Sequence, residues 1–565
     1  MPDGRPRILS PVLGRPHPRA AHRWGVDLIT IHCRRLFWSV EVSDRSERDH
    51  WPALAARLGE ADELGITMIH QAFSRRRFLA AAGGIAAGAL VTSCSASANQ
   101  LQPRRVAPNS PQVLRVEKAR RTAGQGITEV SRTVVHGDVD LGGRVVRTWS
   151  YDGQLPGGEI RVRRGELLQV AVRNELPVET TIHWHGLALR NDMDGVPVLT
   201  QRPIAPSGRF IYEFTIPDSG TFWFHSHVGV QLDRALYAPF IVEDPAEPGA
   251  YDTELVVTLD DWLDGTGRDP DTVFQQLRIH GMGDMGGTGG MEMDRSALLG
   301  GDAGDVIYPY FLANGRLASA AQVVATRARQ RIRLRLINAG SDTAFRIGLP
   351  GVPMTVTHTD GFPVQPVKAE VVLLGMGERI DAIVTVPERA VPLLALAEGK
   401  NGFAQLVLQP GRGSPPDPVG LVAELSTRPV LMVSDTQADD AVRLAERAPD
   451  VVHELKLGGP DPNYTWTING QVYDPSRGVP VREGKRVQLR FTNATTMFHP
   501  MHLHGHTFQI RSPGGVGPRK DTITVLPRRV VEVDFDATNP GQWLTHCHNV
   551  YHGEAGMMTV VSYVE

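Results

Sequence analysis

Three segments of the chain share one pattern of apolar and polar positions. Residues 166–174, 330–338 and 485–493 each alternate apolar with polar side chains and then end in asparagine. Alternation with a period of two predicts a β-strand that turns one face to a core. The apolar positions are Leu168, Val170 and Val172 in the first segment, Ile332, Leu334 and Leu336 in the second, and Val487, Leu489 and Phe491 in the third.

The spacing of these segments predicts the domain organisation. Successive copies lie roughly 160 residues apart, a size that suits one β-sandwich domain. We therefore expect an all-β chain of three consecutive sandwich domains at 107–248, 250–412 and 428–565, with the Pro- and Gly-rich stretch 410–418 as a linker. The 565 residues are too many for a single core, and 58 Gly and 41 Pro suit a protein rich in turns.

The first hundred residues read as a targeting sequence. Residues 74–79, Ser-Arg-Arg-Arg-Phe-Leu, resemble the twin-arginine export signal, and the apolar run that follows at 78–91 is too short for a membrane span. The run ends in a sequence similar to a lipoprotein acylation site at Cys94, with ordinary cleavage near 96–98 as the alternative. We expect an export signal at 68–98. We expect residues 1–67 to have no fold and to result from a start site assigned too far upstream, because Met68 stands where a start is expected.

Charge and cysteine content exclude several classes of function. The formal net charge of -3 argues against a nucleic-acid partner, which would favour a strongly basic surface. Three cysteines, Cys33, Cys94 and Cys547, are too few for a disulfide framework. An exported chain of this kind would act in the cell envelope, in the periplasm or on the outer face of the membrane, and would touch the membrane only through a lipid on Cys94. We expect a monomer.

Paired histidines follow the first and third repeats. The pairs are 183/185, 225/227, 502/504 and 546/548, whereas the middle repeat continues into 343–347 without any such pair. Residues two apart on a strand face the same way, and imidazole binds copper, zinc, iron and nickel. The pattern predicts a metal site shared between the first and third domains, with the middle domain as a spacer.

The fourth pair encloses a cysteine. If residues 546–548 are extended, the thiol of Cys547 points away from both histidines, so one tripeptide touches two metal sites. His499 lies upstream, and His552 and Met557 lie downstream. Two histidines, a cysteine and a weakly bound methionine form the ligand set of a blue electron-transfer copper, whereas zinc favours a closed tetrahedral set.

The histidine motifs at 183–186, 225–227, 499–506 and 546–558 resemble the four copper motifs of multicopper oxidases, a family that includes laccases, ferroxidases and copper-resistance oxidases. The resemblance implies three cupredoxin-like Greek-key β-sandwiches and four copper ions. It implies a type 1 copper held by His499, Cys547, His552 and axial Met557, and a type 2 copper held by His183 and His502. The type 3 pair would be held by His185, His225, His227, His504, His546 and His548.

The resemblance also implies a reaction. A reducing substrate gives single electrons to the type 1 copper, the electrons pass through Cys547 and its flanking histidines, and dioxygen is reduced to water. Carboxylates suit the supply of protons. Asp194 resembles the acid that relatives carry near the type 2 copper, with a simple turn residue before Gly195 as the alternative. Many relatives have Glu directly after the last histidine of the fourth motif; Gly553 stands there in this chain, and Glu554 is the candidate for the second proton-relay acid.

A methionine-rich segment at 282–293 bears on the substrate. It contains Met282, Met285, Met291 and Met293 between glycines, and thioethers are soft ligands that suit Cu(I). The alternative is a Gly-rich loop whose methionines have no role. We expect Cu(I) as the reductant, with Fe(II) as a second metal ion, in copper resistance. A laccase-type oxidase of phenols and a copper-binding protein without turnover are the other hypotheses.

Overall fold

The computed structural model describes residues 103–565 except 245–246, 248–250, 282–294 and 513–515, together with the backbone of 30–34 and 37–41. The chain divides into two units, 1–99 and 100–565. In the first unit β1 (Thr30–Arg34) and β2 (Phe37–Glu41) pair as an antiparallel hairpin where the sequence predicts no fold; an isolated hairpin is marginally stable in water. The predicted export signal at 68–98, its Cys94, and Met282, Met285, Met291 and Met293 lie outside the described residues.

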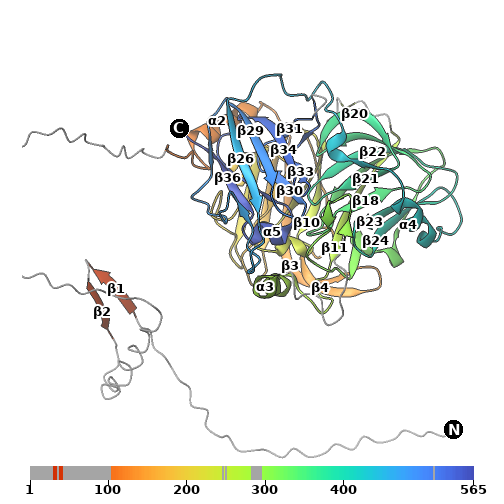
Figure 1. The fold of residues 1–565 in the computed structure, drawn as a ribbon, viewed down its shortest axis with the longest axis horizontal. Coiled ribbons are helices and arrows are strands. Elements are labelled where there is room, and N and C mark those ends of the chain that lie inside the picture. The colour runs from red at the N-terminus through yellow and green to blue at the C-terminus, as the bar shows by residue number, and fades with distance from the viewer. Residues whose placement is uncertain are drawn as a thin grey trace, which may run out of the picture. The chain divides into compact units, whose positions relative to one another are not determined.

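The second unit consists of three β-sandwiches, as the repeats predict (Figure 1). In the first sandwich one sheet has the order β4 (Val145–Tyr151), β3 (Ile127–Asp140), β6 (Leu167–Asn174), β8 (Arg209–Thr215), and the other the order β5 (Ile160–Arg163), β10 (Tyr237–Glu243), β9 (Gly220–His225), β7 (His183–His185).

The second sandwich is the largest. One sheet has the order β15 (Arg316–Leu317), β14 (Tyr310–Ala313), β11 (Thr253–Trp262), β17 (Arg331–Asn338), β22 (Arg379–Thr385), β19 (Met354–Thr359), β20 (Phe362–Ala369). The other has the order β16 (Gln322–Ala325), β24 (Phe403–Gln409), β23 (Val391–Ala397), β18 (Phe345–Gly348), β21 (Val371–Leu374), β25 (Val430–Met432). A short separate hairpin joins β12 (Arg295–Ser296) to β13 (Gly301–Asp302).

The third sandwich completes the unit. One sheet has the order β27 (Thr467–Ile468), β26 (Val451–Gly458), β29 (Arg486–Asn493), β34 (Val530–Asp536), β31 (Phe508–Ile510), β32 (Arg519–Lys520). The other has the order β28 (Val479–Val481), β36 (Met558–Tyr563), β35 (Gln542–Cys547), β30 (His499–Leu503), β33 (Thr522–Val525). Because β25 pairs with β21, we place the boundary between the second and third sandwiches after Met432.

Few helices accompany the sheets. They are α2 (Pro111–Arg120), α3 (Pro270–His280), α4 (Pro418–Ser426) and α5 (Val550–Glu554). Each begins after a residue whose side chain accepts a hydrogen bond from the first turn, and in α5 this residue is Asn549. Short 3-10 turns lie at Asn191–Met193, Gln231–Asp233, Ala318–Ala320 and Val433–Asp435. Over the part of the chain that the structure describes, no helix is long and apolar enough to cross a membrane.

The three repeat segments form β6, β17 and β29, which occupy the same position in their sandwiches. Each pairs in parallel with the first long strand of its sandwich (β3, β11 or β26) and antiparallel with β8, β22 or β34. The alternating apolar side chains predicted to face inward are all buried: Leu168, Val170, Val172, Ile332, Leu334, Leu336, Val487, Leu489 and Phe491. The alternation therefore identified both the strand and the face that packs in the core.

The asparagine that ends each repeat makes the same three hydrogen bonds. Asn174, Asn338 and Asn493 are buried, and each side-chain amide donates to two main-chain carbonyls at 2.7–3.0 Å. Each side-chain oxygen accepts from the backbone N–H two residues further on, at 2.9 Å. In each case one carbonyl and the N–H belong to the loop that leads to β7, β18 or β30, and the second carbonyl lies on another segment of the same sandwich, so the asparagine ties that loop to its sandwich.

Candidate metal centres

The paired histidines lie on two pairs of adjacent strands or within two residues of their ends. In the first sandwich the register of β7 and β9 sets His183 opposite His225, and in the third the register of β30 and β35 sets His502 opposite His546. The two sets meet: the rings of His183 and His504 stack with centroids 3.8 Å apart, as do those of His185 and His502. All eight paired histidines are buried except His227, which is half-buried.

The meeting of these strands brings ligand atoms together in sets of three. Each set has one ligand atom per residue, all within 4.8 Å of one another. The sets that consist of paired histidines are His183/His502/His504, His183/His185/His225 and His227/His504/His546. The ring of His548 lies 4.9 Å from that of His185 and 5.4 Å from that of His225, between centroids, so it joins the same group.

The unpaired ring nitrogens show that this group suits metal ions. His183, His225 and His502 each use Nδ1 for a hydrogen bond to a main-chain carbonyl, at 2.7–2.9 Å. Their Nε2 atoms are buried and have no hydrogen-bond partner among the described residues, and the same holds for Nε2 of His227, Nδ1 of His185 and both nitrogens of His548. Buried polar atoms normally have hydrogen-bond partners. A cluster of buried ring nitrogens without partners therefore indicates metal ligands whose rings are oriented by the hydrogen bond of the other nitrogen.

Burial keeps these imidazoles in the ligating form. It lowers the pKa of each of six histidines well below the ordinary value, and neighbouring imidazoles lower it further: His185, His225, His227, His504, His546 and His548. A neutral imidazole has a free lone pair for a metal. The third sandwich thus offers neutral nitrogens to the first across their interface.

A second group contains the cysteine. The Cys547 thiol lies 3.6 Å from Nδ1 of both His499 and His552, and these two nitrogens are 3.1 Å apart. Cys547 is a free, buried cysteine. Met557 is fully buried, and its carbonyl accepts a hydrogen bond from the Cys547 amide at 3.0 Å, which places the residue beside the cysteine.

The residues 546–548 join the two groups. His546 belongs to the set with His227 and His504, whereas the neighbouring Cys547 belongs to the set with His499 and His552. Residues 542–547 are the extended strand β35, so successive side chains point to opposite sides. The chain therefore offers a covalent path of one residue between the thiol centre and the histidine cluster.

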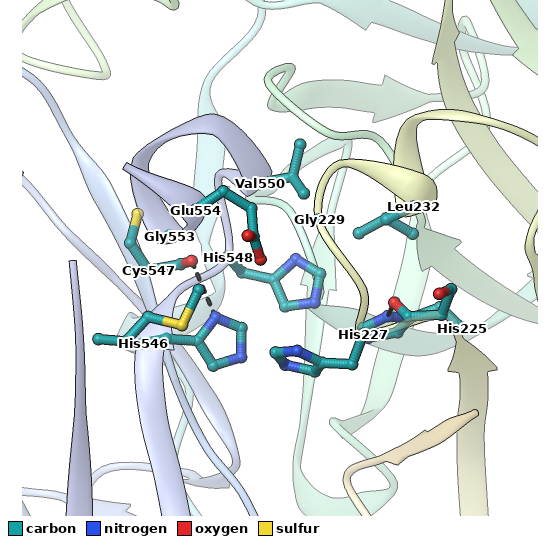
Figure 2. Close-up of a pocket in the computed structure, with 12 residues that line it drawn as sticks. His225, His227, Gly229, Leu232, His546, Cys547, His548, Val550, Gly553 and Glu554 are labelled. Carbon is teal, nitrogen blue, oxygen red and sulfur yellow. Dashed lines mark hydrogen bonds between the residues drawn. The ribbon is translucent and has the colours of Figure 1, made fainter. Parts of the chain in front are cut away.

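Both predicted relay acids lie at the histidine cluster. Asp194 accepts from His504 Nδ1 at 2.9 Å through its carboxylate and from His183 Nδ1 at 2.8 Å through its carbonyl, so it is more than a turn residue before Gly195. Glu554 ends α5 and lines a small cavity with His225, His227 and His548; Figure 2 shows its carboxylate directed into that cavity. Burial raises the pKa of Glu554 to about 7.

Sequence reasoning missed two residues that contact predicted ligands, Asp305 and Asp521, and a third, Arg379, that holds Asp521. Asp305, in the second sandwich, lies with Oδ2 2.8 Å from Nε2 of His552. Asp521 lies 3.1 Å from Nε2 of His185, and Arg379 of the second sandwich binds Asp521. No local pattern marks them, because each acts across a distance of more than a hundred residues along the chain.

Comparison with known proteins identifies the family. Family models described as "Multicopper oxidase" match residues 133–247, 254–392 and 446–565. The multicopper oxidase MmcO of Mycobacterium tuberculosis is 46% identical over 498 residues, covering 87% of this chain and 97% of that protein. The chain belongs to the multicopper oxidase family.

Other relatives and solved structures agree with this membership. A copper resistance protein A homolog of Pseudomonas syringae pv. tomato is 28% identical, over 77% of this chain and 92% of the relative, and a Phlebia radiata laccase is 28% identical, over 72% and 84%. The structure of Fet3p, titled a multicopper oxidase that functions in iron import, matches 77% of this chain and 90% of its own with a TM-score of 0.64 at 20% identity. The predicted cupredoxin-like fold is thereby confirmed.

As a multicopper oxidase, this protein uses four coppers, one of type 1, one of type 2 and two of type 3. The thiol group fits a type 1 copper, because it combines two imidazoles and a cysteine with a nearby methionine. The histidine cluster, with its orphaned nitrogens, fits the other three.

Proposed function

We propose that this oxidase takes its electrons from Cu(I), with Fe(II) as a second metal-ion substrate, and serves copper resistance. Relatives named copper resistance protein A support this proposal. In it, His499, Cys547, His552 and Met557 hold the type 1 copper, and His183 and His502 hold the type 2 copper. The type 3 pair is held by His185, His225, His227, His504, His546 and His548.

The surroundings of the thiol group carry the choice of substrate. His499 and His552 are fully buried, and both outer ring nitrogens are bonded, Nε2 of His499 to the Thr495 hydroxyl at 2.8 Å and Nε2 of His552 to Asp305 at 2.8 Å. The Trp466 ring packs on His552 with centroids 4.1 Å apart. A phenol therefore has no bare imidazole edge to contact among the described residues, whereas the buried carboxylate of Asp305 places a negative charge beside His552 that would attract a cation toward this group.

The electrostatics of this group favour positive charge. Burial alone would lower the pKa of His552, but the hydrogen bonds and charges of Asp305 and Cys547 raise it to about 10. Asp302 lies close by in the chain, and burial together with the charge of Asp305 raises its pKa to about 6. The second sandwich thus places the buried carboxylate of Asp305 on His552 and a second carboxyl group, that of Asp302, near Asp305.

The methionine-rich segment is attached beside this site at both ends. It follows α3, and a Cβ built on Gly281 would lie 3.2 Å from the carbonyl of Pro462, in the loop that carries Trp466. The chain resumes at β12, and Asp302 of β13 forms a bridge with Met497, two residues before His499. These flanks support the proposal that Met282, Met285, Met291 and Met293 bind Cu(I) through their thioethers.

The four coppers supply one-electron chemistry and the reduction of dioxygen to water. The chain's own residues prepare the site for it. Buried histidines exclude water from the thiol group, and carbonyls behind the rings fix which nitrogen faces inward. Asp194 contacts His504, and Glu554 lines the cavity beside His548, so these two carboxyl groups are placed to pass protons to the cluster.

Replacing Asp305 by asparagine tests the choice of substrate. The amide keeps the shape and loses the charge, so we expect turnover of Cu(I) and Fe(II) to fall at least ~10-fold, because the less negative field around His552 attracts the cation less, while turnover of a phenol is unchanged or rises. Replacing the four methionines by leucine keeps an apolar segment without thioethers, and we expect it to lower Cu(I) turnover alone. If Cu(I) turnover is unchanged in both variants, or if phenol turnover falls as much as Cu(I) turnover, the results support a phenol oxidase instead.

We further propose that the protein is exported by the twin-arginine pathway and anchored through acylated Cys94, acting as a monomer in the cell envelope. The order of arginines, apolar run and cysteine at 75–94 supports this. Intact-mass measurement of the mature protein is the test. A mass that begins at Cys94 and includes acyl chains is expected, and a mature chain that begins elsewhere without lipid contradicts the anchor.

A further inference from the structure

The second sandwich contributes none of the predicted copper ligands, yet one of its arginines lies directly behind them. Arg379, the first residue of β22, donates from Nη1 and Nη2 to the two carboxylate oxygens of Asp521 at 2.7 and 2.6 Å. Neither side chain has any exposed surface. Two parallel N–H···O bonds of this kind fix the plane of a carboxylate as well as its position.

With the ligands assigned as in the proposed function, on which this inference rests, Asp521 in turn contacts a type 3 and a type 2 ligand. Its carboxylate lies 3.1 Å from Nε2 of His185, and its main-chain carbonyl accepts from Nδ1 of His502 at 2.9 Å. Burial alone would raise the pKa of Asp521, but the positive charge of Arg379 and the hydrogen bond from His502 hold it below its usual range. The residue is therefore an ionised acceptor, aimed at two rings.

This contact explains an exception among the histidines. An imidazole that donates from Nε2 to a carboxylate has its proton there, which leaves the lone pair of Nδ1 for a metal. Nδ1 is the orphaned nitrogen of His185, whereas Nε2 is the orphan in His183, His225, His227 and His502. Asp521 thus selects the tautomer in which His185 faces the cluster through Nδ1.

The same contact could also create an unwanted metal site. His185, His502 and Asp521 have ligand atoms within 4.8 Å of one another, so these three could themselves hold a metal ion on the wrong side of the rings. Arg379 engages both carboxylate oxygens and places a positive charge there. We propose that Arg379 is a positioning residue by which the second sandwich keeps Asp521 as an acceptor for His185 and out of copper coordination.

The backbone around this pair is shaped to let it approach. Gly186, directly after the His-Trp-His of β7, has φ +91°, and a Cβ there would lie 2.5 Å from Nη2 of Arg379 and 2.7 Å from Oδ2 of Asp521. Asp360 of the second sandwich accepts from the amides of Arg379 at 2.8 Å and of Asp521 at 3.2 Å. Gly186 of the first copper motif and Asp360 of the second sandwich therefore both support the contact between Arg379 and Asp521.

A second contact of the same sandwich reaches the cluster. Gly377, two residues before Arg379, has φ +81°, and a Cβ there would lie 2.9 Å from Cδ2 of His548 and 3.1 Å from Cε1 of His185. The chain therefore packs its backbone against two type 3 rings immediately before it supplies the arginine. The two contacts together restrict the position of the His185 ring.

The test is Arg379→Met in the copper-loaded full chain, with Arg333→Met as the matched control. Methionine keeps an apolar stem and removes the fork. Arg333 lies in the same sheet, is equally buried and binds Asp381 at 2.6 and 3.0 Å, but touches no predicted copper ligand among the described residues. We expect R379M to alter the EPR spectrum of the type 2 copper and to weaken copper retention against a chelator ~10–100-fold, with the blue type 1 band unchanged.

R333M is expected to leave both the EPR spectrum and copper retention as in the parent protein. Arg379→Lys keeps the charge and loses the fork, so an altered type 2 spectrum is expected there too, and this variant decides the matter if R379M does not fold. A parental type 2 spectrum with full copper retention in R379M or R379K would overturn the proposal. So would an equal change in R333M, because the effect would then belong to any lost buried ion pair.

Discussion

The second sandwich and the third are built on one plan and do different work. Both have a buried strand that ends in an asparagine with the same three hydrogen bonds, Asn338 in β17 and Asn493 in β29. After Asn493 the chain enters β30, which carries His499 and His502. After Asn338 it enters β18, whose inward residues are the apolar Phe345 and Ile347.

A sandwich without predicted copper ligands still contacts the proposed copper sites. The second sandwich places Asp305 on His552, Gly377 against His548 and Arg379 on Asp521. It also holds α5, because Asp342 accepts from the side chain of Asn549 at 2.5 Å and Asn549 caps that helix. The middle sandwich, expected as a spacer, thus contacts His552 and His548 directly and reaches His185 through Asp521.

The largest effect should come from replacing Cys547 of the third sandwich, which has no counterpart in the second. In Cys547→Ser a hydroxyl replaces the thiolate, so we expect the blue band to vanish and substrate turnover to fall to background, because the path through 546–548 starts at the sulfur. The EPR signal of the type 2 copper should remain. Absorption, EPR and oxygen uptake are the measurements, and a persistent blue band would contradict the assignment of Cys547.

A smaller effect should separate the two asparagines. Asn338→Ala and Asn493→Ala each leave buried carbonyls unsatisfied, so each should lower the free energy of unfolding by about 1–3 kcal/mol. Only Asn493→Ala should also weaken retention of the type 1 copper, because its loop leads to His499. Urea unfolding and copper analysis check this. Equal loss of copper in both variants would mean that the asparagines act through stability alone.

The smallest effect concerns the stability of the second sandwich at acidic pH. Burial alone would raise the pKa of Asp381, but the charges of Arg333 and Arg335 lower it to about 2. A depressed pKa contributes stability above the unfolded value near 3.8, and this is lost as pH falls toward about 2, roughly 2 kcal/mol in all. Unfolding by urea between these pH values should show the loss in the parent and lack that part of it in Asp381→Asn. An unchanged pH dependence in this variant would refute the role of Asp381 in acid stability.

Much of the fold and the site could be predicted because the signals are local. Alternation identified β6, β17 and β29, and the spacing of paired histidines identified the shared cluster. Asp305, Asp521 and Arg379 could not be predicted, since they reach their partners from other sandwiches or distant loops and follow no period. Glu554 was uncertain from spacing alone, because only the turn of α5 decides that its carboxylate enters the cavity beside His548.

The most direct test of the account is the stoichiometry of oxygen uptake with Cu(I) as the electron donor, together with an assay for hydrogen peroxide. We expect four Cu(I) ions to be oxidised for each dioxygen consumed and no peroxide to be released, because a type 1 centre connected to a three-copper cluster delivers four electrons to one dioxygen. Two Cu(I) per dioxygen with release of peroxide, or no uptake above that of copper alone, would contradict it.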